Sequence, residues 1–304
     1  MSATHRPGNG QKETAPMFDL GRRVLGTTAV AAVAIVAATV AAAAQDAPAI
    51  TPTSVIKLFD GKSLANFDTW QVDHHEADPE RVFSVVDQID GAPAIRISGK
   101  FWGGLLTKQA YRDYRLVAEY RWGGATWGNR TTKARDSGVL IHAQGRMGNT
   151  GKDFNGPWLR SIEFQIIEGG VGDILPVAGY TEQGEQVHPE VTARIRPLKE
   201  SEGIFDPKGE PRKFSAGRIN WWGRSPSWED RVGFRGAEDV ESPGLEWTHI
   251  EAVVENGNLT YYVNGKLVNA ATDSTFTSGR IMIQSEGAEI YFRRIDLEPL
   301  TAAK

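Results

Sequence analysis

The segment Ser161–Glu168 carries the residues best suited to chemistry, because it reads Ser-Ile-Glu-Phe-Gln-Ile-Ile-Glu. Its alternation of polar and apolar residues predicts a half-buried β-strand. Successive side chains of a strand point to opposite faces, so Glu163 and Gln165 should share one face. Ile166-Ile167 interrupts the alternation, and a bulge there would turn Glu168 back toward Glu163. Two carboxylates and an amide on one face suit sugar chemistry; the alternative is a solvated strand face.

Further candidate residues lie on other predicted strands and loops. His142 ends a neighbouring predicted strand and could act as a base or a metal ligand, or could be structural. Aromatic rings stack on sugars, so Trp158, just before the glutamate strand, and Trp222, in a long loop, are expected to contact the ligand. Arg135 and Gln284 are expected to contact the substrate, and the alternative for Arg135 is a pair with a carboxylate. Asp136 and Glu286 are further carboxylate candidates, with a place at a turn or strand end as the alternative for each.

Short β-rich segments separated by Gly, Asn, Asp and Pro make up the chain after residue 50. Asn256-Gly257 and Asn264-Gly265 each stand between two alternating segments, and Asn-Gly is a strong hairpin signal. No long helical period is present there. This pattern predicts an all-β, two-sheet antiparallel jelly-roll sandwich in a single domain. The predicted strands cover residues 82–86, 94–98, 105–108, 114–122, 138–142, 161–167, 218–222, 247–254, 259–263, 266–269, 280–284 and 290–297.

The composition excludes several functional classes. The chain has 304 residues, a formal net charge of −4 and no cysteine. Because the charges of both signs are interspersed, no basic surface for nucleic acid or anionic membrane is expected. Without disulfides, stability must come from a core large enough to stand alone.

The N-terminal region reads as an export signal. Arg22-Arg23 precedes an apolar run at residues 24–40, and four alanines stand before Gln45. Such a pattern is typical of a cleaved signal peptide, with an uncleaved membrane anchor as the alternative. We therefore expect residues 1–44, which begin at Met1 or have their true start at Met17, to be removed. Residues 45–54 would be a linker, and the protein would be secreted or periplasmic and free of the membrane.

An ordered set of motifs between Ile56 and Leu300 resembles the 3-keto-disaccharide hydrolase domain family. That resemblance implies a secreted or periplasmic protein with a concanavalin A-like jelly roll over residues 55–300, and the arginine pair of the export signal suggests a bacterium. Residues 184–244, rich in Pro, Gly and charge, are predicted to form a long loop insertion, which departs from the family pattern. The motifs are Leu58-Phe59-Asp60-Gly61-Lys62-Ser63-Leu64, Asp136 to His142, Ser161 to Gly170, Glu246-Trp247-Thr248, Tyr262 to Lys266, Gly279 to Gly287, and Phe292-Arg293-Arg294-Ile295.

The resemblance also implies a carbohydrate substrate and a reaction. A ketone at C3 of a glycoside acidifies the proton on C2, so a base could start elimination of the group at C1, with hydration to follow. Glu163 or His142 would be the base, and Glu168 would assist the leaving oxygen. A divalent cation held by Glu, Gln and His side chains could stabilise the enolate oxygen.

Two other functions stay open from the sequence. Laminarinase-type retaining hydrolases carry Glu-x-Asp-x-x-Glu on one strand, and Glu163 and Glu168 have that spacing with Gln165 in the central position. A retaining pair needs carboxyl groups about 5–5.5 Å apart. A non-catalytic carbohydrate-binding module needs aromatic and amide side chains but no pair of glutamates.

Overall fold

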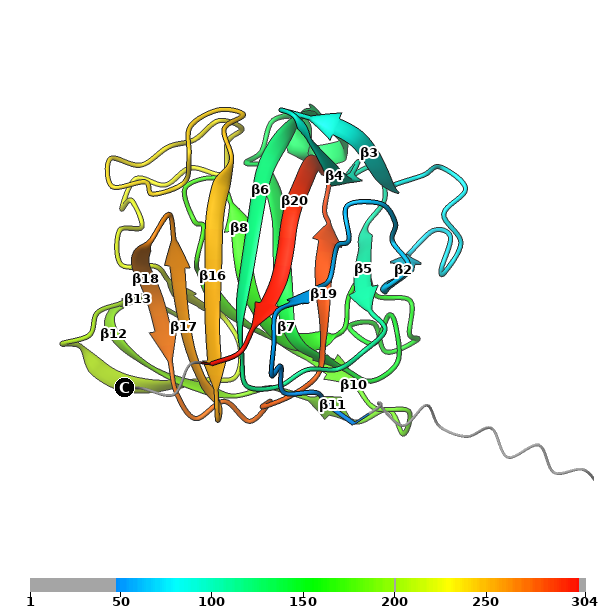
Figure 1. Cartoon of the computed structure of the whole chain (residues 1–304). Coiled ribbons are helices and arrows are strands. Elements are labelled where there is room, and N and C mark those ends of the chain that lie inside the picture. Colours follow the sequence, from blue (N-terminus) through cyan, green and yellow to red (C-terminus); the bar gives the residue numbers. More distant parts are fainter. Residues whose placement is uncertain (1–47, 200, 301–304) are drawn as a thin grey trace, which may run out of the picture. The chain divides into compact units, whose positions relative to one another are not determined.

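The computed structural model describes residues 48–199 and 201–300, which form one β-sandwich (Figure 1). The expected signal at residues 1–44 lies outside the described residues. Ile50, in the expected linker, pairs with Tyr111 of the sandwich. Among the described residues, no helix has the length and apolar character needed to cross a membrane.

Two large sheets face each other. The eight-stranded sheet runs β18 (Lys266–Ala271), β17 (Asn258–Val263), β16 (Thr248–Glu255), β6 (Tyr114–Thr126), β20 (Ala288–Glu298), β4 (Ala92–Ile97) and β3 (Phe83–Ile89), with β1 (Ile56–Lys57) beside β20. The ten-stranded sheet runs β14 (Glu210–Phe214), β12 (Val191–Lys199), β13 (Glu202–Phe205), β15 (Arg218–Asn220), β9 (Ile174–Val177), β8 (Arg160–Ile167), β7 (Asp136–Gln144), β19 (Arg280–Ser285), β5 (Gly103–Thr107) and β2 (Phe67–Gln71). A small hairpin of β10 (Gly179–Tyr180) and β11 (Gln186–Val187) and the 3₁₀ turn η1 (Gly128–Thr131) complete the elements.

The sequence prediction of an all-β sandwich is confirmed, and each predicted strand has a counterpart. Both Asn-Gly pairs form tight hairpin turns with positive φ at each residue, φ 47° and 79° at Asn256-Gly257 and φ 48° and 76° at Asn264-Gly265. The prediction of a long loop at residues 184–244 is wrong in part, because β12 to β15 extend the ten-stranded sheet there. β13 and β15 run parallel, so the pairing is not wholly antiparallel.

The main core lies between the two sheets. Ile162, Phe164 and Ile166 of β8 point into it, as their alternation predicted. The ring of Phe164 stacks on Tyr261 of β17 with centroids 4.2 Å apart, so the two sheets meet directly at this point. The alternate residues of β8 therefore face outward from the ten-stranded sheet.

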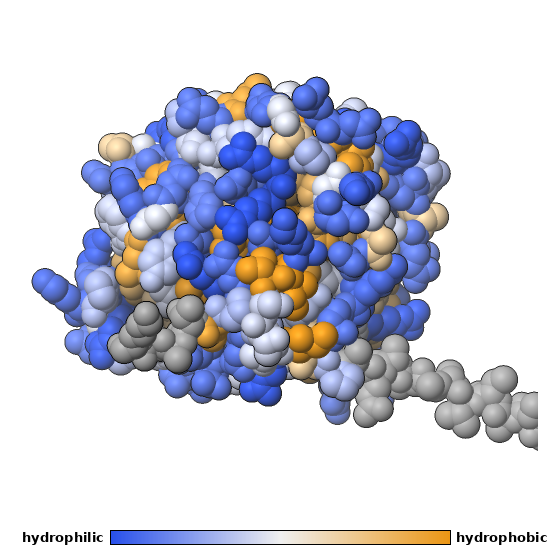
Figure 2. All heavy atoms as spheres, viewed as in Figure 1, coloured by the Kyte–Doolittle hydropathy of each residue, from blue (hydrophilic) through white to orange (hydrophobic). Residues whose placement is uncertain are grey.

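The outer face of the eight-stranded sheet carries paired charges. Arg115 donates to Glu251 at 2.8 Å, and Arg293 pairs with Glu119 across β6 and β20. Figure 2 shows a hydrophilic band over this face, with smaller apolar groups below it. The candidate active site lies instead on the outer face of the ten-stranded sheet.

Candidate active site

Five polar side chains gather on the outer face of β7, β8 and β19. Strand register explains why residues so far apart in the chain meet: Gly138 pairs with Gln165 across β7 and β8, and Ile283 of β19 pairs with Val139 of β7. All five are at most 8% exposed. We call them the polar cluster: Asp136, Glu163, Gln165, Gln284 and Glu286.

Gly138 forms the floor of the polar cluster. A Cβ atom at this position would lie 2.4 Å from Gln284 Oε1 and 2.6 Å from Glu163 Oε1. The missing side chain therefore leaves the space in which the amide and the carboxyl meet. A glycine with no positive φ in a strand interior is typical of such a close approach.

One arginine pairs with two of the three carboxylates in the polar cluster. Arg130, a buried residue of η1, donates through Nη2 to Asp136 and, at 2.9 Å, to Glu286. Gln165 Nε2 donates to the other Asp136 oxygen at 2.9 Å. Asp136 and Glu286 are thus held by the scaffold, whereas Glu163 forms no ion pair within the described part of the chain.

Burial dominates the electrostatics of the carboxyl groups. Desolvation, reinforced by the negative charge of Asp136, raises the pKa of Glu163 to about 8, against the opposing charge of Arg218. Burial also raises the pKa of Asp136, although Arg130 counteracts it. The pKa of Glu286 is raised well above its ordinary value for the same reason. A carboxyl with a pKa near neutrality can exchange a proton with a substrate, which an ordinary surface glutamate does poorly.

Two amides in the polar cluster keep unused hydrogen-bonding atoms. Gln165 Oε1 and both amide atoms of Gln284 are buried without a hydrogen-bond partner among the described residues. The Gln284 amide lies against the Glu163 carboxyl and favours its ionised form, but the two do not reach good hydrogen-bond geometry. Buried polar atoms are normally satisfied, so these are places for ligand hydroxyl groups or water.

An arginine pair stands behind the polar cluster. Arg218 Nη1 and Arg224 Nη1 each lie 2.8 Å from the same Asp173 oxygen. Asp173 neighbours Gln165 through a backbone hydrogen bond of 3.0 Å. Burial lowers the pKa of Arg218, but the charge and hydrogen bond of Asp173, with smaller contributions from the charges of Glu163 and Asp136, raise it overall. The guanidinium therefore lies within electrostatic reach of the cluster. Arg218 begins the predicted strand at residues 218–222, and Arg224 lies in the segment predicted as a long loop; neither arginine was predicted to belong to the site.

Two stacked tryptophans border the polar cluster near Leu140. Trp158 packs against the outer-face apolar group that includes Leu140, the β7 partner of Glu163. Its ring stacks on Trp102 at 5.6 Å, and Trp102 is 37% exposed. The expected contact of Trp158 with the ligand stays a prediction. Trp102, next to β5, was not singled out, although its place before Gly103-Gly104 could have signalled it.

His142 does not share a face with Glu163, so that prediction is wrong. The ladder between β7 and β8 shifts register after Ile141, and His142 there has φ 55°. The imidazole consequently turns inward: Nδ1 donates to Phe276 O at 2.8 Å, and the ring packs edge-on against Tyr114 in the main core. Burial lowers the pKa of His142 to about 4, which suits a neutral structural histidine.

Glu168 is not turned toward Glu163 either. Pairing continues regularly past the expected bulge, since Glu168 N donates to Arg135 O at 3.2 Å. Five positions along a regular strand put the two glutamates on opposite faces. The Glu168 carboxylate accepts from Arg135 N and Nη1, both at 2.9 Å, and from Gly233 N at 2.8 Å. Arg135 thus pairs with a carboxylate, the alternative to its expected substrate contact.

Trp222 lies apart from the polar cluster. Its Nε1 donates to Leu267 O at 2.8 Å and its backbone N to Val268 O at 3.2 Å, so it covers β18, the edge strand of the other sheet. No hydrogen bond or ring contact joins it to the cluster within residues 48–199 and 201–300. Trp158, rather than Trp222, borders the site.

The donor set does not favour a metal ion. No group of three or more His, Cys, Asp or Glu side chains in the described residues is arranged to hold one. Asp136 and Glu286 already share Arg130, and His142 faces the core. A divalent cation therefore stays a prediction from the sequence.

Fold and site together define a β-sandwich that carries a buried carboxylate and free amides on one outer sheet face. The chain belongs to the 3-keto-alpha-glucoside-1,2-lyase-like domain family, which matches residues 54–298. No curated protein matches the chain.

Solved structures of similar proteins have low identity to the chain. A candidate glycosyl hydrolase of Parabacteroides distasonis ATCC 8503 is 16% identical, with a TM-score of 0.45 over 82% of this chain and 94% of that one. The carbohydrate-binding module CBM66 of Bacillus subtilis is 12% identical, with a TM-score of 0.38 over 77% and 95%. The β-glucanase of Bacillus licheniformis is 13% identical, with a TM-score of 0.36 over 83% and 95%.

Proposed function

We propose that the protein cleaves the glycosidic bond of 3-keto-glycosides by elimination across C1 and C2, followed by hydration. The observation that carries this proposal is Glu163, a carboxyl 5% exposed, free of ion pairs in the described chain, with its pKa raised to about 8. Family membership supports the substrate class, because the family is described as 3-keto-alpha-glucoside-1,2-lyase-like.

Glu163 acts as the base. Its carboxylate takes the proton from C2, and the C–H electrons form an enolate with the negative charge on the C3 oxygen. The enolate then re-forms the ketone, makes the C1–C2 double bond and expels the C1 oxygen, which takes the proton from Glu163. Water adds across that double bond, OH to C1 and H to C2, and gives the free 3-keto sugar. Because the base must be ionised, cleavage should increase with pH up to about 8.

Neighbouring groups stabilise the enolate and orient the sugar. Gln284 Nε2 has no partner in the described protein and donates to the C3 oxygen as charge develops there. Arg218 adds positive charge at the same side, and it already interacts with Glu163 electrostatically. Gln165 Oε1 accepts from a sugar hydroxyl. The Trp102–Trp158 stack forms an apolar wall for a sugar ring.

The two alternative functions are less well supported. A retaining hydrolase needs two carboxyls on the same side of the sugar, but Glu168 lies on the opposite strand face from Glu163 and is held by Arg135. A binding module needs no buried carboxyl with a raised pKa, and such groups destabilise a fold unless they serve a purpose. Glu163 therefore favours an enzyme.

Isotope exchange tests the proposal. The protein is incubated in heavy water with a 3-keto-glucoside and, separately, with the unoxidised glucoside. We expect cleavage of the 3-keto-glucoside with deuterium at C2 of the product, and no cleavage of the unoxidised compound. Equal cleavage of both, or cleavage without C2 deuterium, would favour an ordinary hydrolase.

A further inference from the structure

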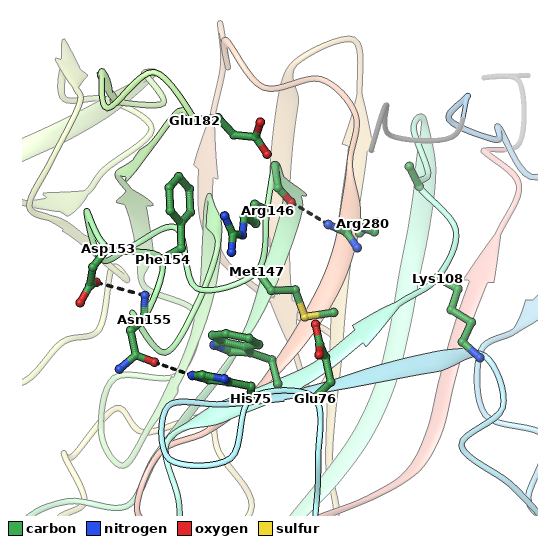
Figure 3. Close-up of a pocket in the computed structure, with 13 residues that line it drawn as sticks. His75, Glu76, Lys108, Arg146, Met147, Asp153, Phe154, Asn155, Glu182 and Arg280 are labelled. Carbon is green, nitrogen blue, oxygen red and sulfur yellow. Dashed lines mark hydrogen bonds between the residues drawn. The ribbon is translucent and has the colours of Figure 1, made fainter. Parts of the chain in front are cut away.

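A pocket lies on the same outer face as the polar cluster but at a distance from it. This pocket has a volume of about 980 Å³, and none of the five polar-cluster residues lines it. Its floor includes Arg280 of β19, which is four residues from Gln284 on the same strand and face, so their Cα atoms are about 13 Å apart. Figure 3 shows the residues that surround it.

The charges that line this pocket are balanced. Three cationic and three anionic side chains surround it: Lys108, Arg146, Arg280, Glu76, Asp153 and Glu182. An anionic ligand would meet three carboxylates, and a cationic ligand would meet three cations. A neutral ligand with many hydroxyl groups could use both donors and acceptors without an unpaired charge.

Aromatic rings on two walls suit the same kind of ligand. Arg146 lies over the ring of Phe154 at 4.7 Å, and Figure 3 shows the two side by side with His75 and Glu76 below them. The His75 ring stacks on the Trp70 ring, with centroids 5.0 Å apart and an angle of 7° between the ring planes. Sugars present apolar C–H faces as well as hydroxyl groups, and aromatic rings contact such faces.

The backbone of both walls is held in an uncommon conformation. Phe154 has φ 60° and His75 has φ 55°, both in the left-handed region that bulky residues seldom adopt. His75 Nε2 lies 3.2 Å from Asn155 Oδ1, which links the two walls. Strained residues tend to gather at functional sites, because the surrounding structure has to hold them there.

We propose that this pocket is a second carbohydrate site, which binds a neutral oligosaccharide separately from the polar cluster. Phe154 and Arg146 provide the stacking surface, and the balanced charges hold the hydroxyl groups. The proposal does not depend on 3-keto chemistry, since unoxidised sugars suffice as ligands. It would let the protein hold a glycan while the polar cluster acts on another sugar unit.

Calorimetry with the full chain tests this site. The probes are cellotriose, maltotriose and laminaritriose, with trigalacturonate and triglucosamine as charged counterparts. We expect at least one neutral trisaccharide to bind, and Arg146→Ala and Phe154→Ala each to weaken it about 10-fold. Arg146 is exposed, so its variant should fold even where Phe154→Ala does not.

Matched variants separate the two sites. Arg212 lies over Phe214 at 4.2 Å outside the pocket, so Arg212→Ala should leave binding unchanged, as should Glu163→Gln. The proposal is overturned by tighter binding of either charged probe or by no binding of any neutral trisaccharide. Loss of binding in Glu163→Gln alone also overturns it, because the sugar would then occupy the polar cluster. Absence of 3-keto cleavage would refute only the proposed function.

Discussion

The carboxyl of Glu163 and the amide of Gln284 lie side by side above Gly138, although they belong to β8 and β19 on either side of β7. A Cβ at Gly138 would come within 2.6 Å of the first and 2.4 Å of the second. The candidate base and the candidate enolate donor therefore meet only because the strand between them has no side chain at this point.

Gly138→Ala should abolish most of the activity while leaving the fold intact. The new methyl group displaces the ends of two flexible side chains, and a misplacement of about 1 Å can cost about 10²-fold in rate. Gly124→Ala is the matched control, because nothing lies within 4 Å of a Cβ there. Cleavage rates and melting temperatures of both variants check this. Full activity in Gly138→Ala would mean that the juxtaposition is not needed.

Glu163→Gln should lower cleavage of a 3-keto-glycoside about 10²- to 10⁴-fold, the usual contribution of a positioned base. Glu168→Gln should instead lower stability by about 1–3 kcal/mol, since it weakens charged hydrogen bonds to Arg135 and Gly233. Steady-state kinetics and urea unfolding of the two variants measure the contrast. Loss of cleavage in Glu168→Gln, together with loss of stability alone in Glu163→Gln, would make Glu168 the catalytic group.

The stability of the wild type should fall with rising pH relative to Glu163→Gln. The folded-state pKa of Glu163, about 8, lies above its ordinary value of 4.5, so the folded protein binds more protons between these values. The contribution of Glu163 to the free energy of unfolding is fully present below about pH 4.5. It is lost as pH rises toward 8, by up to about 1.4 kcal/mol per pH unit. Urea unfolding of both proteins at pH 5 and pH 8 measures the difference, and a constant difference would contradict the prediction.

His142→Asn should affect stability and not catalysis. Asn accepts the positive φ at this position but loses the ring contact with Tyr114, and its amide has to replace the Nδ1 bond to Phe276 O. We expect a loss of about 1–3 kcal/mol in unfolding free energy with kcat/KM unchanged. A large fall in kcat/KM for the folded variant would show that His142 takes part in catalysis.

Trp102→Ala should raise KM about 3- to 10-fold with little change in kcat, because a stacking wall binds ground state and transition state alike. Trp158→Ala should do the same, with some loss of stability since Trp158 packs against the outer-face apolar group. Trp222→Ala is the control, because Trp222 covers β18. Equal effects in all three variants would show that the stack has no special role.

The sequence by itself determined the strands and the face of the central glutamate. Alternation with period two is a local property, so Ser161–Glu168 predicted that Ile162 and Phe164 point inward and that Glu163 and Gln165 share the other face. The Asn-Gly pairs determined two hairpins for an equally local reason, since few other residues accept positive φ in both turn positions. The short alternating segments with their turns likewise predicted the all-β sandwich, and Gln284 was predicted as a substrate contact from the sequence.

Only the tertiary structure decided which groups join Glu163. The register shift falls in β7 after Ile141, and not at Ile166-Ile167, so His142 turns into the core and Glu168 stays on the opposite face. Bulges and register depend on the partner strands, which local alternation does not encode. Arg130 and Arg218 reach the site from distant segments for the same reason: their positions follow from how the sheets are paired and packed.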